Sequence, residues 1–148
     1  IPKRDWSSDV CSSDLPRVAG VMVGQPLQIK NSDNLLHNVH SVTEHAGNNF
    51  NFGQPNAGSS NSLKMKEEDV MLKLGCDVHN WMRAYVGVVT NPYYAVSDAS
   101  GNFTISGVPP GTYTIDAWHE RFGPTKKSIT VTAGGTVTAD FAYMSTEK

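Results

Sequence analysis

Apolar and polar residues alternate in short runs along most of this chain, which is the pattern of β-strands. Residues 27–30 (Leu-Gln-Ile-Lys) and 62–66 (Ser-Leu-Lys-Met-Lys) alternate with a period of two, as strands with one buried face do. Residues 46–62 are rich in Gly, Asn and Ser, so a long loop is predicted there. Four further apolar runs predict strands at residues 18–23, 35–42, 70–74 and 84–89.

A second set of short strands is predicted after residue 91. Residues 112–118 alternate, with Tyr113, Ile115 and Ala117 on one face. Residues 128–132 and 136–141 flank a Gly-Gly pair and are predicted to form a terminal hairpin. Because no segment has the length and period of a helix, the fold class predicted from the pattern is all-β.

The first fifteen residues break this pattern. They have no hydrophobic period and no recognisable pattern of a helix cap or turn, and they resemble the translation of a sequencing-adapter oligonucleotide. Residues 1–15 are therefore interpreted as a non-native scar, with a natural polar arm as the alternative. The native N-terminus is then expected upstream of Pro16, together with a signal peptide and some strands. The remaining chain is divided into a first domain at 16–90 and a second at 91–148.

Composition and charge narrow the class of protein. Of the 148 residues, 39% are hydrophobic and 18% are charged, which suits a packed core and is too little charge for a disordered chain. The net charge is −2 and no basic block occurs, so no nucleic-acid partner is expected. No apolar run approaches the roughly 18 residues of a membrane span, so none is expected.

The strongest chemical signal is the segment that runs from Cys76 to Met82. Cys76, His79 and Met82 follow one another at intervals of three, so one compact loop can turn all three side chains toward one point. His37, far upstream on a predicted strand, can add a second imidazole. One thiolate, two imidazoles and a weak axial thioether are the ligand set of a mononuclear blue-copper site that cycles between Cu(I) and Cu(II). Leu36, Val78 and Trp81 are expected to keep water from the ion.

Several alternatives remain open for these residues. Cys76 can be a buried structural cysteine, or a nucleophile paired with His79. It can also form a disulfide with Cys11, although Cys11 has no structural or functional role if residues 1–15 are a foreign scar. A zinc site is a further option, in which Met82 has no role. Its four ligands would be His37, His40, Cys76 and His79.

The other histidines are expected to play smaller parts. His40 follows His37 by three positions, so on a strand it points to the opposite face and is predicted to be exposed. His45 lies in a polar stretch and is predicted to be solvated. His119 is interpreted as a polar residue at a strand end, with an auxiliary metal contact as the alternative.

The motifs also resemble a known family. His37-Asn38-Val39 after an apolar strand, followed by Cys-x-x-His-x-x-Met at 76–82, is similar to the cupredoxins, and the short loop is most similar to the amicyanin type. The resemblance covers residues 17–90. It implies a Greek-key β-sandwich, and it implies that the Asn38 side chain ties the two ligand loops together.

The C-terminal part resembles a different family. Residues 98–103 and 107–113 (Gly-Val-Pro-Pro-Gly-Thr-Tyr) are similar to transthyretin-like or carboxypeptidase-regulatory-like β modules. This implies a small β-sandwich module packed against the first domain. The whole chain resembles bacterial exported proteins that join such a module to a plastocyanin-like site, which implies a periplasmic or otherwise exported location. Strands missing before Pro16 would leave an open sheet edge, so self-association through that edge is expected.

The function predicted from these observations is single-electron transfer by one bound copper ion. The protein is then an electron carrier and not an enzyme, and its partner is a redox protein such as a cytochrome or an oxidoreductase. Two rival functions are a copper chaperone or storage protein, and a non-catalytic adhesion or scaffold module.

Overall fold

The computed structural model describes residues 4–9 and 13–144, with side chains from residue 16 onward. The predicted all-β class is confirmed, because the described residues form β-strands and one turn of 3-10 helix, η1 (Ala46–Asn48). No helix in the described ranges is long and apolar enough to cross a membrane. The chain divides into two compact units, residues 1–103 and 104–148, while the division predicted after residue 90 stays a prediction.

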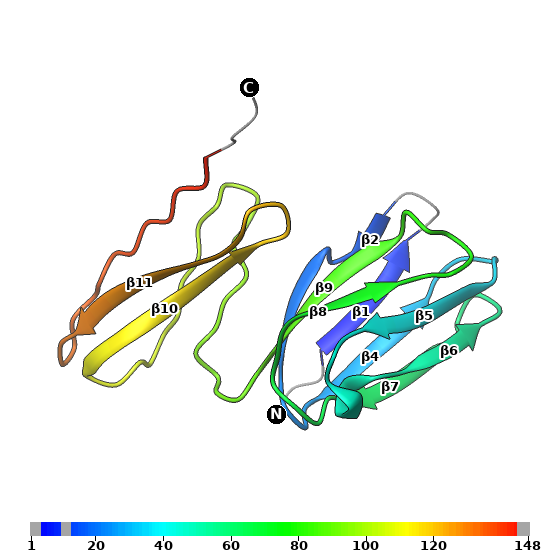
Figure 1. Ribbon diagram of the computed structural model, residues 1–148, viewed down its shortest axis with the longest axis horizontal. Helices are drawn as coiled ribbons and strands as arrows, with labels where there is room; N and C mark the ends of the chain where they lie inside the picture. The colour runs from blue at the N-terminus through cyan, green and yellow to red at the C-terminus, as the bar shows by residue number, and fades with distance from the viewer. Residues whose placement is uncertain (1–3, 10–12, 145–148) are drawn as a thin grey trace. The chain divides into compact units, whose positions relative to one another are not determined.

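The first unit contains a five-stranded sheet in the order β3-β9-β8-β5-β6 (Figure 1). Its outer strand β3 runs parallel to β9, and the other neighbours are antiparallel. The central strands carry the apolar runs of the sequence. The bounds are β3 (Val18–Met22), β5 (His37–Val42), β6 (Asn51–Gln54), β8 (Asp69–Gly75) and β9 (Arg83–Val89).

The second sheet of this unit has four strands in the order β2-β1-β4-β7. They are β1 (Arg4–Asp9), β2 (Ser13–Leu15), β4 (Pro26–Asn31) and β7 (Ser60–Lys64). The backbone of the segment interpreted as a scar thus supplies two strands, and β1 runs parallel to β4. Cys11 lies outside the described residues, and so does the alternative disulfide that would include it.

The long loop predicted at residues 46–62 is wrong. This stretch contains β6, which pairs with β5, and the start of β7, which pairs with β4. Backbone hydrogen bonds of the neighbouring strand hold both segments, and such bonds do not require apolar side chains. Phe50 and Phe52 pack against the core with their rings stacked 5.4 Å apart.

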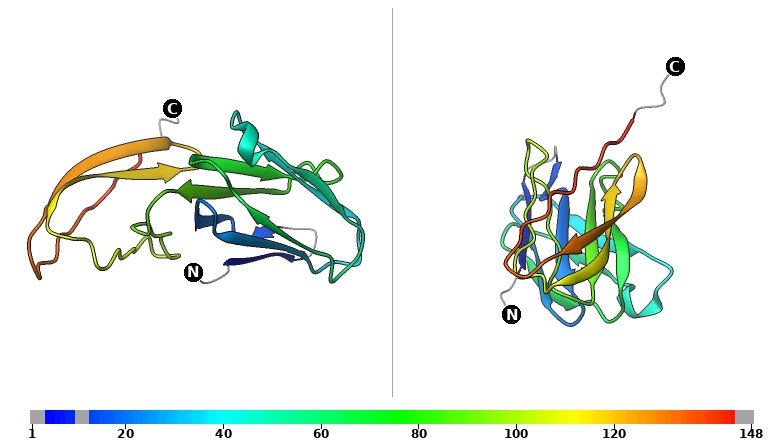
Figure 2. Two further views of the ribbon diagram at one scale, coloured as in Figure 1. Left: turned by 90° about the horizontal axis from the view of Figure 1, so that it is seen from below. Right: turned by 90° about the vertical axis from the view of Figure 1, so that its left-hand side faces the viewer.

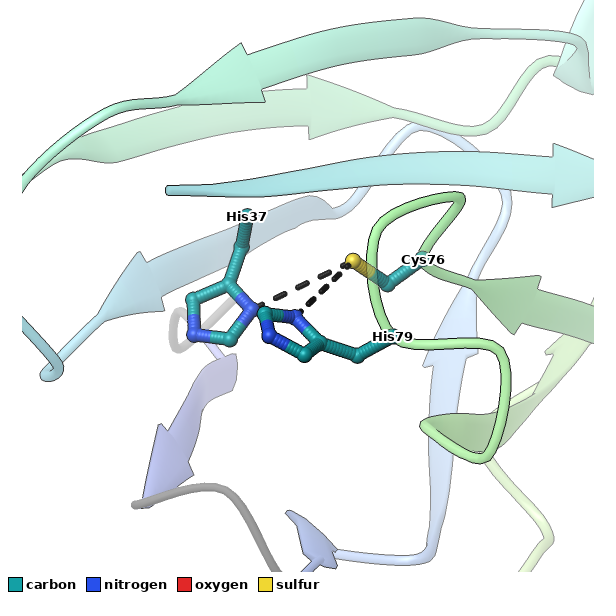
Figure 3. A group of neighbouring side chains, drawn as sticks. All are labelled: His37, Cys76 and His79. Atoms are coloured by element: carbon teal, nitrogen blue, oxygen red, sulfur yellow. Dashed lines mark hydrogen bonds between the residues drawn. The ribbon is translucent and has the colours of Figure 1, made fainter. Parts of the chain in front are cut away.

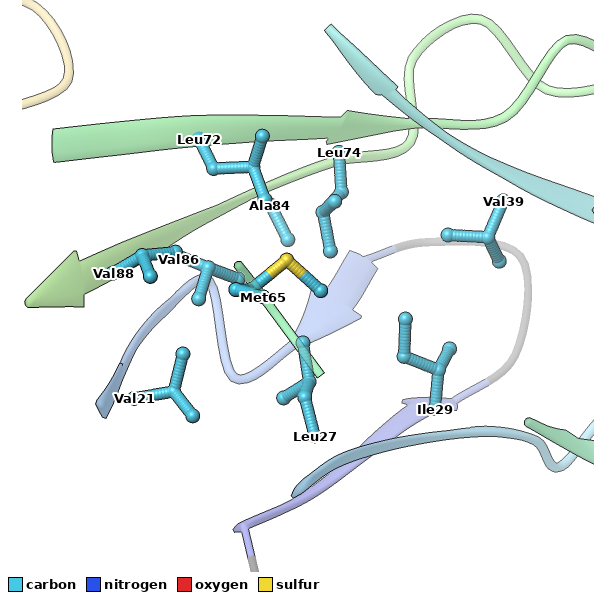
Figure 4. Close-up of a cluster of buried hydrophobic side chains, with 10 residues drawn as sticks. All are labelled: Val21, Leu27, Ile29, Val39, Met65, Leu72, Leu74, Ala84, Val86 and Val88. Carbon is cyan, nitrogen blue, oxygen red and sulfur yellow. The ribbon is translucent and has the colours of Figure 1, made fainter. Parts of the chain in front are cut away.

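The core lies between the two sheets of the first unit, which Figure 2 shows as two layers. Alternate residues of each strand point inward, so β4 buries Leu27, Ile29 and Asn31 and exposes the residues between them more. Burying each of these aliphatic side chains stabilises the unit by about 1.5–3 kcal/mol. The ten core side chains, at most 6% exposed, are Val21, Leu27, Ile29, Val39, Met65, Leu72, Leu74, Ala84, Val86 and Val88 (Figure 4).

The second unit is a separate β-sheet module. Its strands β10 (Gly111–His119) and β11 (Gly123–Val131) pair antiparallel along their whole length, from Gly111 opposite Val131 to His119 opposite Gly123. The predicted hairpin between residues 128–132 and 136–141 is wrong, because β11 pairs with β10. No residue among the described positions 104–144 is buried.

Residues 98–102 form a tight turn, in which the backbone N–H of Gly101 donates to the Asp98 carbonyl at 3.0 Å. Backbone N–H groups of Asn102 and Ser100 donate to the Asp98 carboxylate at 2.8 and 2.9 Å, and Gly101 takes a φ of 84°. These hydrogen bonds, that of Asn102 above all, hold the pKa of Asp98 below its ordinary value.

Candidate metal centre

Two neighbouring strands bring the predicted ligands together. His37 is the first residue of β5, and its side chain points inward together with those of Val39 and Ser41. Cys76 directly follows the last residue of β8, and β8 pairs with β5 so that Gly75 lies opposite His40. His79 lies in the short loop between β8 and β9. Residues far apart in sequence therefore meet at one end of the five-stranded sheet.

His37, Cys76 and His79 form one cluster, shown in Figure 3. The Cys76 Sγ lies 3.9 Å from Nδ1 of His37 and 3.8 Å from Nδ1 of His79. The ligand atoms all lie within 4.8 Å of one another. His37 is 2% exposed and Cys76 7%, while His79 is half-buried. Three donor atoms therefore converge on one point that is largely shielded from solvent.

These separations fit a bound first-row metal ion. Bond lengths of about 2.3 Å to sulfur and about 2.0 Å to nitrogen place the two atoms about 3.7 Å apart when the angle is about 120°. A tetrahedral angle gives about 3.5 Å with the same bond lengths. The observed distances of 3.8 and 3.9 Å are slightly longer than both values, and the ligand atoms spread over as much as 4.8 Å. The side chains would therefore draw in around an ion, and the spacing does not distinguish the two angles. The preference for copper over zinc rests on the donor set, because one thiolate and two imidazoles with a nearby thioether are the ligands of a blue-copper ion.

Met82 ends the ligand loop. It is 4% exposed, and its backbone N–H donates to the His79 carbonyl at 3.0 Å, which closes the loop into a turn. The side chain is thus held inside the first unit immediately before β9. Its role as the weak axial ligand stays a prediction.

Asp33 is a contact of the centre that the sequence analysis missed. Its Oδ2 lies 2.9 Å from Nε2 of His37, and the two side chains are 4% and 2% exposed. A carboxylate accepts hydrogen bonds, so this contact places the imidazole proton on Nε2 and turns the lone pair of Nδ1 toward Cys76. The only signal in the sequence is an acidic residue four positions before a ligand.

Asn38 links the strand of His37 to the loop of Cys76. Its Oδ1 accepts the backbone N–H of Asp77 at 2.6 Å, and its Nδ2 donates to the Asp77 carboxylate at 2.6 Å. The Cys76 thiol donates to the same Oδ1 at 3.5 Å. This is the position expected for a residue that ties the two ligand loops together, and that role stays a prediction.

The remaining histidines lie outside the cluster. His40 faces Asp77, with 3.1 Å between Nδ1 and Oδ1, and is 24% exposed. His45 is half exposed and lies 3.3 Å from the Glu67 carboxylate. His119, in the second unit, packs against Phe122 with 4.8 Å between the ring centroids. The zinc set that needs His40 is therefore not gathered among the described residues.

The apolar residues beside the ligands lie at the surface. Leu36, Val78 and Trp81 are 53%, 52% and 56% exposed, and their role in keeping water from the ion stays a prediction. The residue that lies against a ligand is Trp81, whose ring meets that of His79 edge-on at 5.4 Å between centroids. These side chains lie in loops and at the surface, while His37 at the start of β5 and Cys76 directly after β8 are buried.

Comparisons with known proteins return the two families that the motifs resemble. Residues 83–144, less than half of the chain, match the carboxypeptidase regulatory-like domain family. A search of curated proteins finds no match.

Among solved structures, the chain is similar to a purple cupredoxin from Nitrosopumilus maritimus, with 24% identity and a TM-score of 0.46 over 57% of this chain and 97% of that one. It is also similar to a reduced tryptophan-to-tyrosine mutant of amicyanin, with 23% identity and a TM-score of 0.49 over 57% and 80% of the two chains. At these identities and scores, function has to be argued from the site itself.

Proposed function

We propose that the first unit binds one copper ion through His37, Cys76, His79 and Met82 and that the protein transfers single electrons between redox partners. One observation carries the proposal: two imidazole Nδ1 atoms lie 3.8 and 3.9 Å from one thiol sulfur in a largely buried cluster. When bound there, copper supplies one-electron oxidation and reduction.

The residues of the chain have distinct roles in this proposal. The two imidazoles and the Cys76 thiolate would hold the ion, and the Met82 thioether would supply a fourth, weaker donor. His37 lies at the start of β5, and the other three ligands lie in the short loop between β8 and β9. Because these elements pack on a rigid core, the ligands keep their places when the charge of the ion changes by one. Such a site suits an electron carrier without bond-making chemistry.

The burial of the ligands favours electron transfer over copper delivery. A chaperone must pass its ion to another protein, which requires ligands that solvent and partner can reach. Here His37, Cys76 and Met82 are at most 7% exposed. The half-buried His79 is the ligand nearest the surface, and the exposed Trp81 beside it gives a redox protein, such as a cytochrome or oxidoreductase, an apolar place to dock.

We place the protein in the periplasm or another exported location as part of the same proposal. The support is the resemblance of its motifs to exported two-part proteins. Fractionation of cells that express the complete gene tests this, and recovery of the protein in the cytoplasmic fraction contradicts it.

The test of the proposal is a titration of the purified protein with Cu(II), followed by visible absorption. An intense thiolate-to-copper charge-transfer band is expected at one equivalent, and it is expected to be absent in Cys76→Ser. Reduction should bleach the band and reoxidation restore it. A protein that takes up zinc tightly and shows no band with copper contradicts the proposal. Slow electron exchange between oxidised and reduced protein would favour the chaperone, and no metal binding would favour the scaffold.

A further inference from the structure

A buried carboxylate lies behind the proposed copper ligands. Asp33 belongs to the turn between β4 and β5, and its side chain is 4% exposed. Its Oδ2 lies 2.9 Å from Nε2 of His37, whereas the other ring nitrogen, Nδ1, is the one that faces Cys76. A charged group this deeply buried is costly unless a partner compensates it, so the contact with the imidazole is a strong one.

The turn that carries Asp33 is itself held rigidly. The backbone N–H of Asp33 donates to Oδ1 of Asn31 at 2.8 Å, and Nδ2 of Asn31 donates to the carbonyls of Leu35 and Gln54 at 2.9 and 3.0 Å. Asn31 and Gln54 are each 1% exposed. The carboxylate is therefore fixed by buried amides of β4 and β6, and it does not reach His37 from a mobile loop.

The contact has two consequences for an ion at Nδ1. First, the carboxylate keeps the proton on Nε2, so Nδ1 is free to bind without a change of tautomer. Second, its negative charge lies one imidazole ring away from the metal. Because Cu(II) carries one more positive charge than Cu(I), a nearby buried anion stabilises the oxidised ion more than the reduced one.

We propose that Asp33 is a positioning residue that orients His37 and lowers the reduction potential of the copper site. This inference rests on the proposed function. It adds a buried anion to a set of ligands that includes only one other negative group, the Cys76 thiolate. The exposed Asp77 carboxylate, 63% exposed, is screened by water, so Asp33 has the larger effect on the ion for each unit of charge.

The variant Asp33→Asn separates the charge from the shape. Its amide oxygen can still accept from Nε2 of His37, so the ring keeps a partner while the anion is lost. We expect the affinity for Cu(II) to fall by about tenfold more than the affinity for Cu(I), which raises the one-electron reduction potential by about 59 mV. Spectroelectrochemical titration measures this shift. Asp33→Glu keeps the negative charge, so its potential should differ from that of the parent protein by less than half of this shift.

A purely structural role predicts a different result. In that case Asp33→Asn weakens binding of both oxidation states equally, and the potential does not change. The distant control is Glu68→Gln, in the exposed turn before β8, at the opposite end of that strand from Cys76. It should leave the potential unchanged. A potential that is the same in the parent protein and in Asp33→Asn overturns the proposal.

A second measurement needs neither copper nor a variant. Nitrogen NMR of the metal-free parent protein reports which ring nitrogen of His37 carries the proton. We expect the proton on Nε2, and a proton on Nδ1 overturns the positioning role even if Asp33→Asn fails to fold. If the protein binds no copper but His37 shows the Nε2–H tautomer, the proposed function fails while the contact with Asp33 stands.

Discussion

The two units of the chain use β-structure in different ways. All of the buried hydrophobic residues among the described positions lie in the first unit, and none of residues 104–144 is buried. The first unit has two sheets that enclose a core, whereas the second has one two-stranded sheet. A cluster of three ligands needs a surround that resists movement, and the proposed metal centre lies in the unit that has a core.

The polar contacts of the two units differ in the same way. In the first unit, buried amides such as Asn31, Asn48 and Gln54 bond to backbone groups of neighbouring segments. In the second, the pairs Thr112–Thr130 and Asp116–Lys126 lie on the surface. Buried hydrogen bonds are costly to break and exposed ones are replaced by water. The difference shows that β-structure can form either a unit held by a buried core or a sheet without one, in which substitutions are expected to cost less stability.

The largest contrast is expected from one substitution made in each unit. Ile29 in β4 is 0% exposed, so Ile29→Ala leaves a cavity and should lower the free energy of unfolding by about 2–5 kcal/mol. Ile115 in β10 is half-buried, and Ile115→Ala should cost about 1 kcal/mol or less. Hydrogen exchange of amides in β4 and β10 measures the two effects separately. Equal losses of stability in β4 and β10 would contradict the view that only the first unit depends on a buried core.

Copper is expected to stabilise one unit and not the other. An ion that binds only the folded first unit adds about 2.7 kcal/mol at a free concentration one hundred times the dissociation constant. Protection from hydrogen exchange should therefore rise in β5 and β8 and stay constant in β10 and β11. The matched control is His37→Ala, which should remove the gain. A uniform rise over both units would show that the ion acts elsewhere.

A smaller contrast comes from side-chain hydrogen bonds. Asn38→Ala removes two 2.6 Å contacts with Asp77, and we expect a loss of about 1–2 kcal/mol from the first unit. Thr112→Ala removes the exposed contact of 3.1 Å with Thr130 and should change stability by less than about 0.5 kcal/mol. Urea unfolding followed by circular dichroism compares the two variants. A larger loss for Thr112→Ala would reverse the order that the number and length of the hydrogen bonds predict.

The smallest effect is expected from an ion pair on the surface of the second unit. Asp116 and Lys126 lie 3.3 Å apart with side chains 57% and 67% exposed, so water and salt screen their attraction. Asp116→Asn should lower stability by less than about 0.5 kcal/mol, and 1 M salt should remove the difference. Hydrogen exchange in β10 at low and high salt measures it. A salt-independent loss above 1 kcal/mol would mean that this unit holds a buried charge.

Much of the fold was predictable because several strands have alternating or continuous apolar residues in the sequence. Residues 27–30 and 84–89 alternate or form apolar runs, and the structure places them in β4 and β9. Strand partners were harder to predict. Residues 128–131 pair with β10 and not with residues 136–141. The hydrophobic period of a sequence indicates that a segment is a strand, but it does not indicate which strand pairs with it. Polar strands such as β6 were missed since backbone pairing alone identifies them.

The metal centre was also predictable only in part. His37, Cys76 and His79 were predicted from their chemistry and spacing, and the structure brings them together. Asp33 was not, because an acid four positions before a histidine is common and gains meaning only when a turn buries it. Trp81 was predicted to shield the ion, which stays a prediction, and it lies exposed beside His79. Sequence spacing identifies ligands better than it identifies their surroundings.

The central claim is that His37, Cys76 and His79 bind copper together. X-ray absorption at the copper edge of the loaded protein tests this most directly, because it reports the atoms bound to the ion. We predict one short sulfur distance and two imidazole nitrogens in the parent protein, with the sulfur lost in Cys76→Ser and one imidazole lost in His37→Ala. A copper ion surrounded only by oxygen and nitrogen in the parent protein would contradict the account.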